Sequence, residues 1–140
     1  MAGGVQILVV GSGAPNLRWG GGARRTYQLL HELKQTFGDD GVAFVERTEL
    51  DPLPSTFTQW LQRKSHRAVA KITDYVDNPF HLVSTGGFGY GRYLGHVRSR
   101  YRSLLARHKD VRVCIFEHLE FAHFSDLNRS LGLTTVLAPW

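Results

Sequence analysis

The sequence predicts an α/β domain of three layers, in which a mostly parallel sheet is flanked by helices. Short apolar runs alternate along the chain with longer segments of helical periodicity, an order that favours a parallel sheet with right-handed crossovers. The first run, residues 5–10, is almost continuously apolar, as in a strand covered on both faces. A length of 140 residues suits a single domain, residues 1–140, which is large enough to bury a hydrophobic core.

The amino-terminal elements follow from local patterns. Between residues 23 and 37, apolar side chains recur at steps of three and four with polar ones between them, which predicts an amphipathic helix. Gly38 ends this helix. A second strand is expected over residues 42–45, and two prolines break the chain soon afterwards.

The same patterns continue toward the carboxyl terminus. The expected elements are a helix over residues 57–76, a strand over 80–84, a glycine-rich loop over 85–91, a helix over 93–108, a strand over 111–116, a short helix over 124–131 and a strand over 134–138.

Composition excludes several classes of protein. With 42% hydrophobic and 21% charged residues, the chain is neither a disordered tail nor a membrane bundle. A single cysteine, Cys114, excludes an internal disulfide framework and a zinc site of several thiolates. We expect no secretory signal, because no basic region precedes the first apolar run. The net charge of +5 is moderate, and a solvated surface is favoured over an anionic partner as its explanation.

The loop after the first strand matches no dinucleotide fingerprint. That fingerprint is Gly-x-Gly-x-x-Gly leading directly into a helix. Gly11 and Gly13 supply its first two glycines, but Asn16 occupies the position of the third glycine, and more residues intervene before the helix. The Gly-Lys-Ser/Thr phosphate loop of nucleoside triphosphatases is absent as well. Glu46 ends the second strand, where a dinucleotide fold keeps its ribose-binding acid, but without that fingerprint it is interpreted as a surface carboxylate.

The stronger feature of that loop is a run of three glycines, Gly20, Gly21 and Gly22, followed closely by Arg24 and Arg25. Missing side chains let the backbone approach a ligand, and the unpaired N–H groups of a helix start favour an anion such as a diphosphate. The alternative is a flexible turn that only starts the helix.

A second polar cluster follows the expected strand over residues 111–116. Glu117, His118 and Glu120 lie at the carboxyl end of that strand, where ligands of parallel sheets collect. His118 can donate or accept a hydrogen bond near neutral pH, or simply bond to backbone as a loop histidine. The order of these acidic and histidine residues does not match the zinc-binding helix motif His-Glu-x-x-His, so no metal site is predicted.

Two further features favour structural interpretations. The helix over residues 93–108 carries many arginines interleaved with tyrosines, which suits nucleic acid or anionic lipid, but the arginines are spread around the helix and a solvated helix is favoured. Cys114 lies inside an apolar strand, which predicts a buried, inert thiol.

These segments together resemble a known family. Residues 5–10, the loop to residues 20–25 (Gly-Gly-Gly-Ala-Arg-Arg) and the following helix resemble the opening of the amino-terminal domain of GT-B glycosyltransferases, most closely the retaining family 4. Residues 111–120 are similar to a later strand of that family, which ends in an acidic and histidine stretch, and residues 131–139 are similar to the next strand. The resemblance does not extend to residues 52–91.

The resemblance implies a Rossmann-like domain that holds the acceptor and faces a second domain holding most of a nucleotide-sugar donor. Gly20, Gly21 and Gly22 would reach the donor diphosphate, and the histidine matching His118 would orient the donor sugar as the catalytic residue. Arg24, Arg25, Glu117 and Glu120 are further candidates for substrate binding.

The family's carboxyl-terminal domain has no counterpart in these residues, so we expect an incomplete enzyme that is inactive alone. The resemblance implies a saccharide or lipid acceptor, no metal or other cofactor, and a cytoplasmic location with peripheral contact at the inner membrane face. Two alternatives stay open: a stand-alone nucleotide- or phosphate-binding Rossmann-like module, and a basic interaction domain for a membrane surface or, less favoured, for nucleic acid.

Overall fold

A computed structural model describes residues 3–11, 13–18, 20–50, 54–77, 95–117, 121 and 124–138. It contains a parallel sheet of four strands in the order β2-β1-β3-β4. The strands are β1 (Ile7–Gly11), β2 (Val42–Glu46), β3 (Val113–Phe116) and β4 (Thr134–Leu137). The predicted fold class is therefore confirmed: the described residues form a Rossmann-like α/β arrangement.

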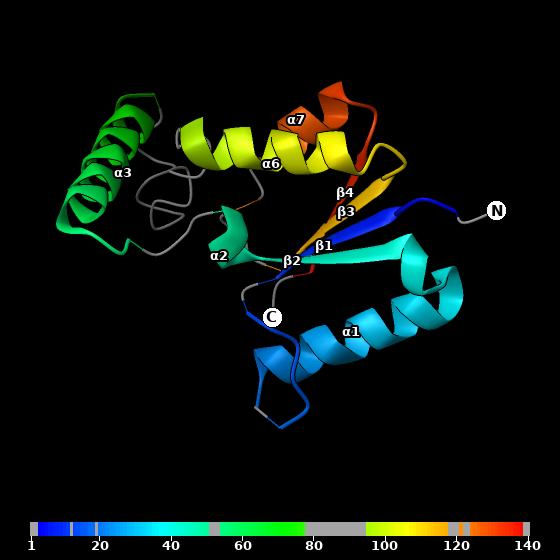
Figure 1. Ribbon diagram of the computed structural model, residues 1–140. Helices are drawn as coiled ribbons and strands as arrows, with labels where there is room; N and C mark the ends of the chain where they lie inside the picture. Colours follow the sequence, from blue (N-terminus) through cyan, green and yellow to red (C-terminus); the bar gives the residue numbers. More distant parts are fainter. Residues whose placement is uncertain are drawn as a thin grey trace.

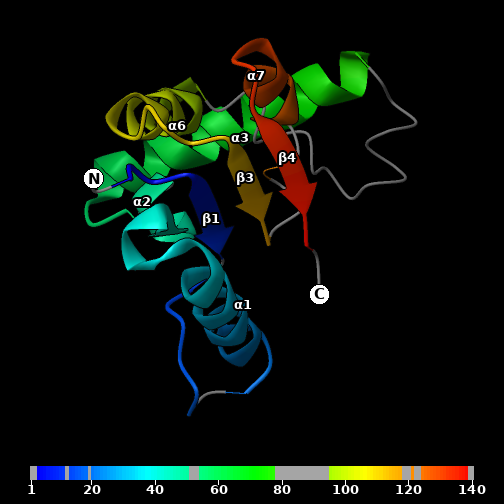
Figure 2. The ribbon, with the colours of Figure 1, turned by 90° about the vertical axis from the view of Figure 1, so that its right-hand side faces the viewer.

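Helices cover both faces of this sheet (Figure 1). One face carries α1 (Gly22–Phe37), and the other carries α6 (Gly95–Arg107) and α7 (Ser125–Ser130). Figure 2, turned by a quarter, shows the same separation, with α1 on one side of the strands and α6 and α7 on the other. This gives the three layers that the sequence predicted.

The sequence patterns did not predict two elements, because these elements are too short to show periodicity. They are the 3-10 turn η1 (Asp39–Gly41) and α2 (Arg47–Leu50). The long helix α3 (Phe57–Asp77) was predicted, and it lies beside the amino-terminal end of α6, away from the sheet (Figure 1). The strand and glycine-rich loop expected over residues 80–84 and 85–91 lie outside the described residues.

The sheet divides the core in two. Odd-numbered side chains of β1, such as Val9, pack with Leu30 of α1, while even-numbered ones, such as Leu8, face α6 and α7. Successive strand residues point to opposite faces of the sheet. A strand covered by helices on both faces therefore needs an uninterrupted run of apolar residues. The core on the α6 side is also rich in aromatic rings, and Tyr101 stacks on Phe124 with ring centroids 4.6 Å apart.

Buried polar atoms tie α6, α7 and β4 together. The Tyr101 hydroxyl donates to Oδ1 of Asn128 at 2.6 Å, and Nδ2 of Asn128 donates to the hydroxyl of Thr135 at 2.9 Å. The Sγ atom of Cys114 lies 3.3 Å from the same tyrosine oxygen. Cys114 is fully buried, and burial raises the pKa of its thiol, so the prediction of a buried thiol is confirmed.

Candidate functional site at the carboxyl edge of the sheet

The strand order creates one topological switch point. From β1 the chain crosses by α1, on one face, to its neighbour β2, whereas α6, on the opposite face, leads into β3 on the other side of β1. In open α/β sheets, ligands bind where the order reverses, beyond the carboxyl ends of the two strands. Here those ends are Gly11 of β1 and Glu117, which directly follows β3.

Glu117 is held tightly at this edge. Its backbone N–H donates to the carbonyl of Val10 at 3.0 Å, and the residue is only 5% exposed. The hydroxyl of Thr26, in α1, lies 2.7 Å from Oε2 of Glu117 and 3.0 Å from the carbonyl oxygen of Gly22. The carboxyl group therefore joins the end of β3 to the first turns of α1.

Gly11 leaves the space that this carboxyl group fills. A Cβ atom on Gly11 would lie 2.6 Å from Oε2 of Glu117 and 2.6 Å from the ring of Phe44. Real Cβ atoms do not approach other heavy atoms so closely, so any side chain at the end of β1 would force Glu117 or Phe44 to move.

The three-glycine run lies at the start of α1. Gly20 and Gly21 are exposed, while Gly22 is buried as the first residue of the helix. Gly21 caps the helix with φ of 65°, a conformation that favours glycine, and no side chain caps the helix. A Cβ atom at either Gly20 or Gly21 would meet no heavy atom within 4 Å, so this stretch of backbone faces open space.

The electrostatics of the helix start favour an anion. The first turn of α1 contains no acidic residue, and Arg24 and Arg25 are both exposed. The loop before it is closed by a hydrogen bond from the N–H of Asn16 to the carbonyl of Ala23 at 3.1 Å. Together with the helix dipole, these features give a positive, sterically open helix start.

His118 and Glu120 lie outside the described residues, so the catalytic role predicted for His118 and the binding role predicted for Glu120 are not tested. The structure does place Glu117, directly before them, within contact of Thr26, one turn after Gly22. Glu117 and the start of α1 therefore belong to the same edge of the sheet.

Sequence reasoning missed Thr26. Residues 22, 26 and 30 are all buried and lie four apart on one face of α1. Threonine on such a stripe is typical of a core position, and only the fold shows that its hydroxyl meets Glu117, 91 residues away.

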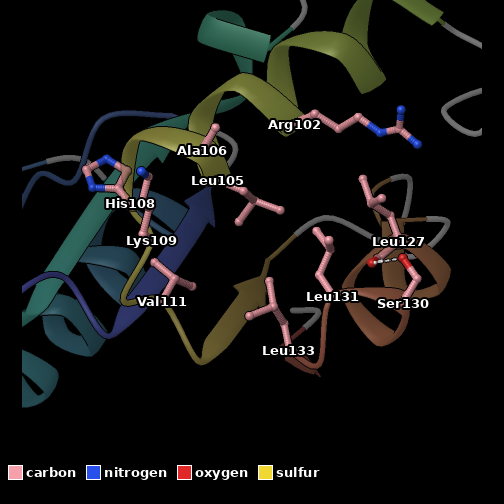
Figure 3. Close-up of a pocket in the computed structure, with 10 residues that line it drawn as sticks. All are labelled: Arg102, Leu105, Ala106, His108, Lys109, Val111, Leu127, Ser130, Leu131 and Leu133. Atoms are coloured by element: carbon pink, nitrogen blue, oxygen red, sulfur yellow. Dashed lines mark hydrogen bonds between the residues drawn. The ribbon is translucent and has the colours of Figure 1, made fainter.

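Another cavity lies elsewhere in the fold. It measures about 530 Å³ and lies between α6 and α7 (Figure 3). Val111 and Leu133, which come shortly before β3 and β4, contribute to it, so it opens near the amino ends of the strands. Its floor is aliphatic, with Arg102, His108 and Lys109 at its rim. Because ligands of parallel sheets collect at the carboxyl ends, this cavity is not part of the candidate site.

The described ranges contain neither a cluster of metal-binding side chains nor a helix suited to span a membrane. Within them, no three His, Cys, Asp or Glu side chains come together as a metal site would require. None of the helices described is both long enough and apolar enough to cross a membrane. The arginines of α6 are mostly exposed, and Arg100 bonds to the carbonyl of Glu49 at 3.4 Å, in keeping with the solvated helix that the sequence favoured. Glu46 is half-buried and accepts a hydrogen bond from Thr48 at 3.2 Å.

Comparison with known proteins identifies no relative: no family model, no curated protein and no solved structure matches this chain.

Proposed function

We propose that this chain is the acceptor-side domain of a two-domain GT-B glycosyltransferase, and that its carboxyl sheet edge contacts the diphosphate of a nucleotide-sugar donor. The observation that carries the proposal is the position of Gly20 and Gly21. They are exposed, face open space and directly precede α1, whose Thr26 contacts Glu117 at the carboxyl end of β3. Such a helix start binds phosphate groups through its backbone N–H groups.

The chemistry required of these residues is the stabilisation of negative charge. As the sugar is transferred, charge grows on the departing nucleoside diphosphate. Fixed N–H donors at the start of α1 would stabilise that charge, and Arg24 and Arg25 would add to the positive potential. No reorganisation is needed at the moment of transfer, because the donors are part of a helix.

Thr26 and Glu117 act as positioning residues in this scheme. Their contact fixes the distance between the start of α1 and the end of β3. His118 follows Glu117 directly and has the role that the family resemblance implies, which is to orient the donor sugar. The acceptor, a saccharide or a lipid, would lie on this domain and most of the donor on the second one.

A nucleotide titration tests the anion site. UDP and GDP are titrated by calorimetry into the natural full-length protein and its Gly20→Val variant. Gly20 has neither a positive φ nor a neighbouring heavy atom, so valine is tolerated by the fold but obstructs a ligand. We expect affinity to fall roughly tenfold or more, which corresponds to about 1.4 kcal/mol. The matched control is Gly3→Val, which also faces open space and should bind normally.

Transfer itself is measured as release of nucleoside diphosphate from nucleotide-sugars in the same full-length protein. A His118→Ala variant that loses turnover but keeps nucleotide affinity supports the proposal. Nucleotide binding without any transfer would favour the stand-alone phosphate-binding module instead. Absence of binding to either nucleotide would overturn both.

A further inference from the structure

The cavity between α6 and α7 is large enough to hold a small molecule. It measures about 530 Å³, and pockets that bind small molecules in proteins span about 300–1,000 Å³. Val111 and Leu133, which lead into β3 and β4, line it near the amino ends of those strands (Figure 3). The cavity includes none of the residues placed at the carboxyl edge, so the proposed transferase function gives it no role.

The walls of the cavity are mainly aliphatic. Leu105 of α6 and Leu127 of α7 line it from the two helices, and they are only 8% and 5% exposed. Leu131, just after α7, also lines it but is 54% exposed, so it lies where the cavity meets solvent. The Ser130 hydroxyl already donates its proton to the carbonyl of Leu127 at 2.7 Å. A ligand would therefore bind these walls mainly by burying apolar surface.

Positive charge lies at the rim of these walls. Residues 102, 105 and 106 are three and four positions apart, which puts Arg102 on the same face of α6 as Leu105. His108 and Lys109 follow the last residue of α6, and their side chains line the cavity as well (Figure 3). Arg102 and Lys109 are exposed, so their charged groups reach solvent at the opening.

The acidic residues nearest in sequence do not neutralise these cations. The carboxyl group of Asp110 lies beside Gly4, Asp126 is exposed on α7, and neither lines the cavity. Among the residues that the structure describes, no carboxylate forms an ion pair with Arg102 or Lys109. An apolar hollow beside such cations favours a ligand that combines an apolar body with one anionic group.

We propose that this cavity binds an aliphatic monocarboxylate of medium chain length. The chain lies along Leu105, Leu127 and Leu131, and the carboxylate binds Arg102 or Lys109 at the rim. A nucleotide-sugar is a poorer occupant, because its hydroxyl groups would lose water without gaining hydrogen bonds from leucine side chains. Inorganic phosphate would leave the apolar walls unfilled. The inference does not depend on the proposed transferase function.

The test is calorimetric titration of the natural full-length protein with hexanoate, octanoate and octanol, whose chains are short enough to stay monomeric in solution. Each buried methylene should raise affinity about threefold to fourfold, so octanoate should bind roughly tenfold more tightly than hexanoate. Octanol, which lacks the charge, should bind more weakly than octanoate. Absence of octanoate binding, equal affinity for octanol, or competition between octanoate and UDP would overturn the proposal.

Two pairs of variants locate the octanoate site. Arg102→Gln/Lys109→Gln should weaken binding roughly fivefold or more, whereas Arg100→Gln/Arg107→Gln removes two exposed cations of α6 that do not line the cavity and should have no effect.

Leu131→Asp puts an anion at the mouth of the cavity and should weaken binding roughly tenfold or more. Its matched control is Leu17→Asp, because Leu17 is 52% exposed and lies outside the cavity. Circular dichroism confirms that each variant is folded, as expected for exposed positions. Unchanged binding in the two cavity variants, or equal weakening in their controls, would overturn the proposal.

Discussion

The hydroxyl of Thr26 lies 2.7 Å from the buried carboxyl oxygen of Glu117, across 91 residues of sequence. This contact joins the first helix to the end of the third strand at the edge where we place the ligand. A buried acidic group normally needs such partners, since burial without them is costly. The pair therefore supports both the stability of the fold and the geometry of the candidate site.

Replacing Thr26 by valine should destabilise the protein. Valine keeps the shape of the side chain but removes the donor to Glu117, and losing a hydrogen bond to a buried polar group costs about 1–3 kcal/mol. Urea denaturation measures the free energy of unfolding. Thr26→Ser keeps the hydroxyl and should stay closer to the wild type, so equal stability of the valine variant and the wild type would contradict this prediction.

Gly11→Ala should also be destabilising, for a steric reason. The new Cβ atom would lie 2.6 Å from both Glu117 Oε2 and the Phe44 ring, so one of them must move. Overpacking of this kind costs about 1–3 kcal/mol, which should appear as a lower urea midpoint. Gly13→Ala is the matched control, because its Cβ atom would meet no heavy atom within 4 Å. Similar losses in both variants would contradict the steric explanation.

Stability should fall at alkaline pH through Tyr101 and Cys114. Burial raises the pKa of each group above its ordinary value, 10.0 for the tyrosine and 9.0 for the thiol, and so keeps both protonated in the folded state. The unfolded chain loses these protons first. The contribution is therefore complete below pH 9 and is lost as the pH rises further.

Urea midpoints measured on either side of pH 9 check this prediction. Cys114→Ala should flatten the first part of the decline, and Tyr101→Phe should flatten the later part, although Tyr101→Phe also removes the donor to Asn128. A decline as steep in the double variant as in the wild type would assign the pH dependence to other groups.

Much of the layered architecture could be predicted because it depends on local patterns. The periodicity of α1 and the position of Gly38, whose φ is 83°, were both visible in sequence. The continuous apolar run of β1 indicated a strand buried on both faces, and residues Ile7 to Gly11 are all buried. Such features depend only on each residue and on its neighbours in the sequence, so sequence patterns can predict them.

The site was less predictable because it depends on contacts between distant segments. Glu117 was expected as a polar group at a strand end, but the sequence did not show that it is buried or that Thr26 meets it. The apolar stripe of α3 shows the same limit. Helical periodicity identifies which residues share a face, but not whether that face meets a core or, as for Phe57, solvent.

The position of β4 at the end of the described sheet has a consequence for how the molecule opens. Val136 is 41% exposed and Leu137 is 44% exposed, whereas every residue of β1 is buried between neighbours on both sides. Peptide amides in an edge strand exchange their hydrogens through small local fluctuations, whereas those in a central strand exchange only when a larger part of the fold unfolds. In heavy water, deuterium should therefore enter β4 early and β1 last.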